Sequence, residues 1–424
     1  MSSFLCTACG HESLKWFGRC PSCGDWSSAS SADPAPEGAE IVSLQSLDDM
    51  PSRLSTGLAE VDRVLGGGLV LGEVVLLAGE PGVGKSTLVL QIVDGIARNK
   101  ARAIIFSGEE SAHQVGLRAA RLGLATDKIS FSPSNSLQAI LEACRAEQPD
   151  LIVVDSIQTM SDRDLEHAAG SVVQVRECAA ALVAHAKAAG SAVLITGHVT
   201  KEGSVAGPKV LEHLVDAVLS LEGERTGAMR LLRAQKNRFG SCDELGVFSM
   251  GERGLTTLED PSALLLDDRA PGTPGSIVYP SMDGSRPLLI ELQALVERSA
   301  LPQPRRVAIG IDQRRLTLVL GVLSKHLSLG LAEMDVFMAA AGGLAVREPA
   351  SDLAMSLALA SAGRGWVIDE RTVAFGEVGL GGEVRRVPGV VRRLEEARRL
   401  GFDRALAPKG TAPCEGIEVV RVTR

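Results

Sequence analysis

The feature that most constrains the fold is a glycine-rich segment, residues 79–87, which reads Gly-Glu-Pro-Gly-Val-Gly-Lys-Ser-Thr. An apolar run, Val74 to Ala78, precedes it, and an apolar-rich stretch, residues 88–93, follows it. This is the strand–loop–helix setting that a P-loop requires. The glycines bring backbone N–H groups close to a phosphate, with no Cβ in the way. The alternative is a glycine-rich turn without a ligand, and the context on both sides favours the phosphate-binding loop.

The end of this segment adds the chemistry of a nucleotide site. A helix that begins near Lys85 directs the positive end of its dipole at the same anion. Lys85 adds a full charge for the β- and γ-phosphates, and the Ser86 hydroxyl can join the coordination shell of Mg²⁺. We therefore predict ATP and Mg²⁺ as cofactors. The predicted nucleotide-binding residues are Gly79, Glu80, Pro81, Gly82, Val83, Gly84, Lys85, Ser86 and Thr87.

Length and charge limit the classes of protein to consider. The chain has 424 residues, enough for two or three domains with sizeable cores. Its net charge of −8 gives no global attraction to nucleic acid or to an anionic membrane, so such contacts must come from local patches. No apolar run reaches the ~20 residues that span a bilayer, and the N-terminus does not resemble a signal peptide. We predict a cytoplasmic protein without a membrane partner.

Four of the eight cysteines are clustered near the N-terminus, with the spacing Cys-x2-Cys-x10-Cys-x2-Cys. Two such pairs of thiolates can close a tetrahedral structural Zn²⁺ site, and metal binding would supply the folding energy of so short a segment. The alternative is a pair of redox-active motifs, but neither is followed by a helix pattern that would lower a thiol pKa. We also expect Trp16 and Trp26 to pack on the metal site. The predicted zinc ligands are Cys6, Cys9, Cys20 and Cys23.

Beyond the P-loop, short apolar runs alternate with longer helical stretches. Runs that are apolar on both faces and separated by helices are typical of a mainly parallel sheet with helices on each side. The sequence therefore predicts an α/β core. The predicted strands are Ala103–Phe106, Leu151–Val154, Ala192–Thr196 and Ala217–Leu221.

Carboxylates stand at the ends of two of these runs. Asp155 follows Leu151–Val154 as in a Walker B strand, where the aspartate holds Mg²⁺. Glu109 and Glu110 follow the run that ends at Phe106, and one of them can orient or deprotonate the attacking water. An aspartate after a strand is more often a cap or turn residue, but the upstream P-loop favours the functional interpretation.

The order of these motifs resembles the RadA/Sms family of bacterial recombination proteins. The resemblance covers nearly the whole chain and includes the zinc knuckles, Thr56-Gly57 with Gly66–Gly68, the P-loop, residues 107–111 and the block Lys-Asn-Arg-Phe-Gly at 236–240. It implies a RecA-like ATPase that assembles into a hexameric ring. It also implies movement on single-stranded DNA, branch migration of recombination intermediates and a recombinase or repair protein as partner.

The resemblance also assigns roles to particular residues. Glu109 matches the place of the catalytic glutamate better than Glu110 does. Lys236 and Arg238 match a basic pair that, in related rings, reaches toward the γ-phosphate of a neighbouring subunit, where a cation stabilises the transferring group. The alternative is that both are solvated surface bases. The predicted catalytic residues are Lys85, Glu109, Asp155, Lys236 and Arg238.

The segment after the run at 192–196 resembles the DNA-binding loop of RecA-like proteins. Thr196 and His198 would sense the γ-phosphate, although a histidine at a strand end is more often only a satisfied polar residue. Lys201 and Lys209 would face a DNA backbone in the ring channel, where cations follow phosphates without reading sequence. Glu202 and Glu212 interrupt this basic character.

The C-terminal third resembles the proteolytic domain of Lon proteases. The predicted strands are 276–279 and 287–294, and the predicted helices are 316–327, 352–361 and 390–400. Lon uses a Ser–Lys dyad, and here the serine place falls on Ser351 and the lysine place on Val391. Valine cannot act as a base, and Arg392 beside it stays protonated. We therefore predict a non-proteolytic scaffold.

This third is richer in arginine than the rest of the chain. Such clusters usually form a solvated face with local ion pairs. The family resemblance instead favours contact with duplex DNA and a role in ring assembly. The arginines are Arg305, Arg306, Arg314, Arg315, Arg385, Arg386, Arg392, Arg393, Arg398 and Arg399.

The predicted organisation has three folded parts. A zinc ribbon occupies residues 1–27, a linker rich in small residues 28–50, a RecA-like P-loop ATPase core 51–270 and an α+β Lon-protease-like domain 276–424. The favoured function is a DNA-dependent ATPase of helicase type. The alternatives are an ATP-dependent Lon-like peptidase and a RecA-fold switch that uses ATP to gate protein partners.

Overall fold

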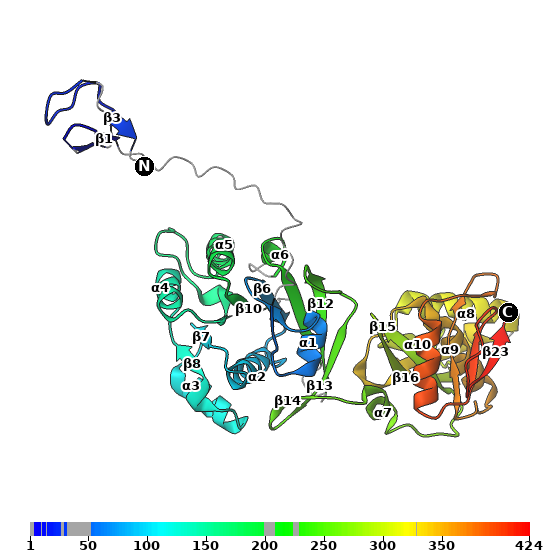
Figure 1. Ribbon diagram of the computed structural model, residues 1–424. Helices are drawn as coiled ribbons and strands as arrows, with labels where there is room; N and C mark the ends of the chain where they lie inside the picture. The colour runs from blue at the N-terminus through cyan, green and yellow to red at the C-terminus, as the bar shows by residue number, and fades with distance from the viewer. Residues whose placement is uncertain are drawn as a thin grey trace. The chain divides into compact units, whose positions relative to one another are not determined.

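The computed structural model describes residues 4–9, 11–13, 15–26, 29–31, 52–198, 208–223, 229–327 and 329–424. The chain separates into a small unit, Met1–Pro51, and a large unit, Ser52–Arg424 (Figure 1). Among the described residues, no helix is both long enough and apolar enough to cross a membrane.

The small unit holds a three-stranded sheet in the order β2-β1-β3, made of β1 (Phe4–Cys6), β2 (Glu12–Ser13) and β3 (Ala29–Ser31). β3 pairs with β1, so the sheet includes residues that the sequence assigned to the linker. The other residues of that linker, 28 and 32–50, lie outside the described residues. The expected packing of the tryptophans is wrong: Trp16 is 67% exposed and Trp26 is 70% exposed. Arg19 lies over the ring of Trp26, at 5.7 Å from its centroid.

The large unit begins with a nine-stranded sheet in the order β14-β13-β12-β11-β6-β10-β9-β7-β8. The strands from β11 to β8 all run parallel. The four strands predicted from the sequence are confirmed, and the mainly parallel α/β core with them. These parallel strands are β6 (Val74–Gly79), β7 (Ala103–Ser107), β8 (Ser130–Ser132), β9 (Leu151–Asp155), β10 (Ala192–His198) and β11 (Ala217–Glu222).

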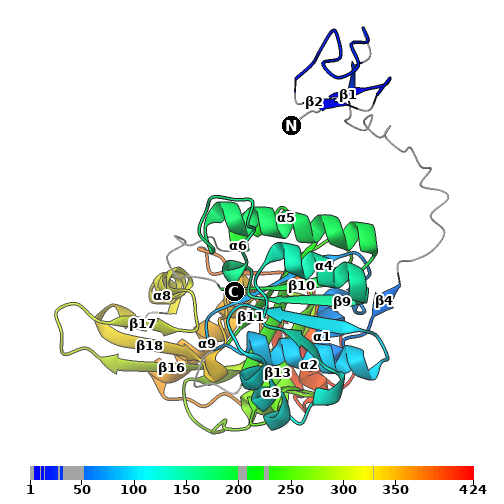
Figure 2. The ribbon, with the colours of Figure 1, turned by 90° about the vertical axis from the view of Figure 1, so that its left-hand side faces the viewer.

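Helices cover both faces of this sheet (Figure 2). Alternate residues of β6 enter different cores: Val75 and Leu77 pack with α1, α2 and α3, whereas Val74 and Leu76 pack with α4 and α5. This alternation explains why β6 is apolar at every position. The helices are α1 (Ala59–Leu65), α2 (Lys85–Arg98), α3 (Ala112–Arg121), α4 (Leu137–Glu147), α5 (Val172–Ala189) and α6 (Pro208–Leu211), and a two-stranded ribbon joins β4 (Arg53–Leu54) to β5 (Leu69–Val70).

Three antiparallel strands extend the sheet beyond β11: β12 (Met229–Asn237), β13 (Leu245–Gly251) and β14 (Gly254–Thr257). Side chains of β12 alternate between two cores. Leu232 and Ala234 belong to the core that contains α1 and α2, whereas Leu231 packs with the core of the C-terminal domain. β12 therefore lies between the two domains and contributes side chains to both cores.

The C-terminal domain is a seven-stranded sheet in the order β17-β18-β16-β15-β19-β22-β23, packed against α8, α9 and α10. Every strand and helix predicted for this region is present. The strands are β15 (Ser276–Asp283), β16 (Arg286–Arg298), β17 (Arg306–Ile309), β18 (Met334–Ala340), β19 (Thr372–Ala374), β22 (Arg404–Pro408) and β23 (Glu418–Val422). The helices are α8 (Gln313–Leu327), α9 (Asp352–Arg364) and α10 (Val390–Arg399), and a separate hairpin pairs β20 (Glu377–Val378) with β21 (Val384–Arg385).

Buried polar contacts join the two domains of the large unit. Arg286 of β16 donates to the carboxylate of Glu60 on α1 at 2.5 Å, and Glu60 also accepts from the Val247 N–H at 2.8 Å. Helix α7 (Pro261–Leu266) precedes the predicted boundary at 271–275, yet its Leu265 lies in the core of the C-terminal domain. The contacts between the two domains therefore come from residues on both sides of the segment 271–275, which reads Pro-Gly-Thr-Pro-Gly.

Candidate nucleotide site and zinc centre

The P-loop joins β6 to α2. Gly82 and Gly84 have φ of 82° and 118°, values that side chains with a Cβ rarely adopt. At Gly79, a Cβ would lie 2.6 Å from the carbonyl oxygen of Leu221 on β11. The loop therefore needs glycine at all three positions, as the sequence predicted.

The side chain of Lys85, the first residue of α2, folds back over the loop. It is 5% exposed, and its Nζ donates to the carbonyl oxygens of Gly79 at 2.8 Å and Glu80 at 3.1 Å. Burial lowers the pKa of Lys85, while the nearby Asp155 and Glu109 carboxylates oppose that shift. The ammonium is thus held at the loop by weak neutral acceptors, which an anionic ligand can replace.

Asp155 lies at the carboxyl end of β9, beside β7 and β10. Its Oδ1 accepts a hydrogen bond from Thr196 at 2.5 Å, and Ser86 of α2 lies close enough to lower the pKa of this carboxyl. Burial raises the pKa of Asp155 despite the Thr196 bond, and the nearby Glu109 raises it further. A divalent cation would offset both effects. Asp155 and Ser86, predicted separately as Mg²⁺ ligands, thus lie together.

Glu109 faces the same edge of the sheet. Ser156 donates to its carboxylate, and the Nε2 of His198 lies 3.4 Å from its Oε1. The hydrogen bond with His198 lowers the pKa of Glu109, assisted by Ser156 and by the charge of Lys85, against the effect of burial. An ionised carboxylate at this place can orient or accept a proton from water.

The two adjacent glutamates occupy different environments. The carboxylate of Glu110 forms an ion pair with Arg118 of α3 at 2.5 Å, whereas Glu109 lies near Lys85 and Ser156. Both backbone N–H groups donate to the hydroxyl of Ser107 at the end of β7. The charge of Glu110 is therefore balanced by Arg118, whereas Glu109 faces the P-loop.

Lys236 and Arg238 lie at the opposite edge of the sheet. The Arg238 N–H donates to the carbonyl of Asp216, whose own N–H donates to Val74 at the start of β6. Gly79 is five residues further along β6, or about 16 Å. Lys236 donates to the carbonyls of Glu212 and Val215, at 2.6 and 2.7 Å. Neither cation is placed to serve the P-loop of its own subunit.

Arg238 is the more accessible of the two. Its side chain is 54% exposed and pairs with the Asp216 carboxylate at 3.2 Å. The rest of the block packs locally: Asn237 donates to the carbonyls of Val64 and Leu65, and Arg53 donates to that of Phe239. A Cβ at Gly66 would lie 3.3 Å from the Cα of Gly240, so the block at 236–240 packs closely against the start of the glycine run at 66–68.

Of the two lysines predicted to bind DNA, the described part of the chain includes only Lys209. Lys209 belongs to the short helix α6 and is exposed. Lys201 lies outside the described residues, as does the rest of the loop at 199–207.

In the C-terminal domain, Ser351 is 2% exposed and its hydroxyl donates to the carbonyl of Glu348 at 2.9 Å. Val391 is 61% exposed on α10. The buried basic residue of that helix is Arg393, whose Nη2 pairs with the Glu348 carboxylate at 2.6 Å. The same guanidinium donates to Pro280 and to Tyr279.

Many of the C-terminal arginines are likewise engaged within the protein. Arg393 is fully buried and is therefore inaccessible to DNA. Five of the ten predicted arginines form ion pairs with carboxylates of the large unit, namely Arg305, Arg315, Arg385, Arg393 and Arg399.

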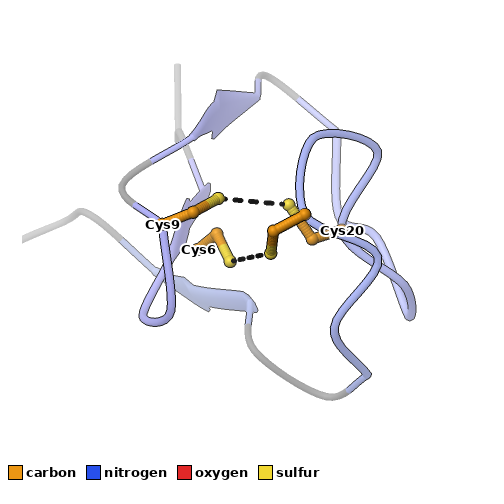
Figure 3. A group of neighbouring side chains, drawn as sticks. Cys6, Cys9 and Cys20 are labelled. Atoms are coloured by element: carbon orange, nitrogen blue, oxygen red, sulfur yellow. Dashed lines mark hydrogen bonds between the residues drawn. The ribbon is translucent and has the colours of Figure 1, made fainter.

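The four clustered cysteines converge in the small unit (Figure 3). The Sγ atoms of Cys6 and Cys23 are 3.7 Å apart, those of Cys9 and Cys20 are 3.6 Å apart, and all four lie within 4.8 Å of one another. Four thiolates around Zn²⁺ at 2.3 Å would stand about 3.8 Å apart. The cysteines therefore fit a closed tetrahedral zinc site.

Sequence reasoning missed two residues that contact the candidate nucleotide site. Ser156 could have been found because it directly follows the Walker B aspartate. Arg230 of β12 donates to the carbonyl of Val83 at 2.9 Å, across 147 residues, and no local pattern marks that contact.

The fold and the site together place the protein in the class of RecA-like P-loop ATPases, with a four-cysteine zinc ribbon added. A family model described as "AAA domain" matches residues 42–204, and one described as "Rubredoxin metal binding domain" matches residues 4–29. A solved KaiC-like protein from Pyrococcus horikoshii aligns with a TM-score of 0.42 at 21% identity, over 49% of this chain and 100% of its own.

Several curated relatives named DNA repair protein RadA match along almost the whole chain. The Pseudomonas aeruginosa protein is 47% identical over 99% of this chain and 96% of its own length. The Bacillus subtilis protein is 43% identical over 99% and 96%, and the Escherichia coli protein is 42% identical over 99% and 95%. The chain belongs to the RadA family of DNA repair proteins.

Proposed function

We propose that the protein is a DNA-dependent ATPase that works as a helicase-type motor in homologous recombination and DNA repair. One observation carries the proposal: Lys85, Ser86, Asp155 and Glu109 come from three segments distant in sequence and meet at one edge of the sheet. Family membership directs the resulting work toward DNA.

Each of these residues has a role in ATP hydrolysis. Lys85 and the P-loop N–H groups hold the phosphates, and Ser86 with Asp155 holds Mg²⁺, which supplies electrostatic stabilisation of the transferring phosphoryl group when bound. Glu109, kept ionised by His198 and Ser156, orients water and takes its proton.

The cavity beside the P-loop is a candidate site for the nucleoside. It has a volume of about 550 Å³ and lies next to Thr87 of α2. Arg121 and Arg253 line it, and a guanidinium can stack on a purine. Met250 and Leu122 supply apolar contact on the same walls.

The site is completed by a neighbouring subunit. Arg238 is exposed at the edge opposite the P-loop, so it can reach a nucleotide only on another copy. A head-to-tail contact of this kind closes into a ring, which we propose is hexameric. Lys236, bound to two carbonyls of its own chain, supports the segment that presents Arg238.

Single-stranded DNA passes through the ring, held by the loop that contains Lys201 and by Lys209. Translocation drives branch migration of recombination intermediates, together with a recombinase or repair protein. The C-terminal domain is a Lon-protease-like scaffold without peptidase activity that supports assembly and contacts duplex DNA. The buried Ser351 hydroxyl and the valine at position 391 support a non-proteolytic domain.

The decisive experiment is the ATPase rate of the full chain without DNA, with single-stranded DNA and with duplex DNA, alongside the subunit count in solution. We expect strong stimulation by single-stranded DNA in a ring-sized oligomer. Hydrolysis that DNA does not change would instead indicate a switch that gates protein partners. ATP-dependent degradation of casein would indicate the peptidase.

A further inference from the structure

A buried arginine lies directly behind the phosphate-binding loop. Arg230 is the second residue of β12 and is 3% exposed. Its Nε donates to the carbonyl oxygen of Val83 at 2.9 Å, and its Nη1 donates to that of Met229 at 2.8 Å. A charged donor bonds to a carbonyl more strongly than a neutral donor does. Among the described contacts, Val83 is the one P-loop residue whose carbonyl oxygen accepts a hydrogen bond from a guanidinium.

The direction of the Val83 carbonyl fixes the direction of the next amide. In a planar trans peptide, the C=O of one residue and the N–H of the following residue point to opposite sides. Holding the Val83 oxygen toward Arg230 therefore turns the Gly84 N–H away from Arg230. Gly84 immediately precedes Lys85 and has φ of 118°. The N–H groups of this part of a P-loop are the donors that cradle phosphates.

The space behind the loop is built for this side chain. A Cβ at Gly223, just after β11, would lie 2.6 Å from the Cδ of Arg230, so glycine makes room for the arginine stem. A Cβ at Gly84 would lie 2.5 Å from the Cε of Met250 on β13. The rear of the loop thus rests on β11, β12 and β13, and Arg230 supplies its polar contact. The fixed charge of the guanidinium also favours an anion on the far side of the peptide.

We propose that Arg230 is a positioning residue of the nucleotide site, which holds the Val83–Gly84 peptide with the Gly84 N–H directed at the phosphates. The inference rests on the proposed binding of ATP at this loop. Arg233 offers a matched comparison, because it stands on the same strand but pairs with Asp283 of the C-terminal domain.

The test compares the full-length wild type with Arg230→Gln, Arg230→Lys and Arg233→Gln. Affinity for Mg²⁺–ADP is measured by calorimetry, and the Gly84 amide resonance is followed by NMR with and without ADP. We expect Arg230→Gln to bind ADP about tenfold more weakly, or about 1.4 kcal/mol. Arg230→Lys retains a donor and should stay close to wild type, as should Arg233→Gln. ADP should shift the Gly84 amide downfield in wild type and Arg230→Lys, and less in Arg230→Gln.

The outcomes separate this inference from the proposed function. A wild type that binds no ADP would overturn both. A wild type that binds ADP, with Arg230→Gln equally tight and its Gly84 shift unchanged, would overturn the positioning role alone. If Arg230→Gln does not fold, Arg230→Lys decides: wild-type affinity with a shifted Gly84 amide supports the role, and lost affinity in a folded protein contradicts it.

Discussion

The edge of the ATPase sheet and the C-terminal domain each hold a carboxylate beside a buried cation, and the two groupings are satisfied in different ways. In the C-terminal domain, Arg393 is fully buried and donates to the Glu348 carboxylate, to Tyr279 and to the carbonyl of Pro280. At the sheet edge, Lys85 donates only to loop carbonyls in the contacts described, while Asp155 and Glu109 lie near it.

The difference shows in how the protein affects each pKa. Glu348 has a lowered pKa because hydrogen bonds and charge from Arg393 outweigh the effect of burial. Asp155 has a raised pKa and Lys85 a lowered one, chiefly because burial penalises both charged forms. We call the group around Arg393 and Glu348 the saturated cluster, because its charges are paired within the protein, and such a cluster has a structural role. Charged groups that lie together without full pairing, as at the sheet edge, are typical of a site whose ligand supplies the missing charge.

The largest expected effect falls on the sheet edge. Glu109→Gln removes the proposed base but keeps the shape of the side chain, so we expect the ATPase rate to fall about 100-fold or more while ATP binding persists. Glu110→Gln is the matched control, since its carboxylate pairs with Arg118, and it should retain most activity. Single-turnover hydrolysis with a separate binding assay measures both, and equal losses in the two variants would count against the distinction.

Substitutions in the saturated cluster should lower the free energy of unfolding rather than the ATPase rate. Arg393→Ala leaves the Glu348 carboxylate unpaired, which we expect to destabilise the C-terminal domain by about 3 kcal/mol. Arg392→Ala, at the exposed neighbouring position, should change the unfolding free energy little. Denaturant unfolding compares the two, and a normal stability for a folded Arg393→Ala would break the contrast.

A third buried carboxylate shows that a perturbed pKa alone does not mark a catalytic site. Burial raises the pKa of Glu73, at the start of β6, to about 7, and the side chain accepts from the Val70 N–H at 2.9 Å. Between its ordinary value and pH 7 the unfolded chain loses this proton first, so stability falls as pH rises through that range. Glu73→Gln keeps the acceptor and should gain about 3 kcal/mol over wild type at pH 8 but not at pH 4. Thermal unfolding at the two pH values measures the gain, and a pH-independent difference would refute it.

The smallest effect is expected at Ser351. Its hydroxyl bonds only to the Glu348 carbonyl and the Met355 sulfur in the contacts described, so Ser351→Ala should cost about 1 kcal/mol and leave ATP turnover unchanged. Casein should remain intact with either protein. If wild type cleaves casein in the presence of ATP and Ser351→Ala does not, Ser351 is a peptidase residue and the domain is proteolytic.

The sequence predicted the parallel strands because runs such as Leu151–Val154 are apolar at every position, and it predicted which polar side chains end them. Since parallel strands end at one edge, the grouping of Asp155 with the P-loop followed from the pattern. The choice of Glu109 over Glu110 came from family resemblance, because adjacent residues look alike in sequence. The structure separates them through Arg118 and His198.

Contacts between distant segments had no signal in the sequence. Glu60 and Arg286 meet across the domains, and Arg230 reaches the P-loop from a strand in a later antiparallel part of the sheet. Neither partner has a local pattern that requires the other. The prediction that the tryptophans of the zinc ribbon are packed was wrong for a related reason. In a unit folded around metal ligands, large apolar residues need not be buried.

A nucleotide site shared between subunits, as we propose, can be tested directly by mixing two inactive variants. Glu109→Gln lacks the base but keeps Arg238, and Arg238→Ala keeps the base but lacks the cation. If Arg238 acts on the neighbour, equal mixtures allowed to exchange subunits should regain about a quarter of the wild-type rate, because that share of random head-to-tail contacts is intact. A mixture that stays as inactive as its parents, despite verified subunit exchange, would contradict the account.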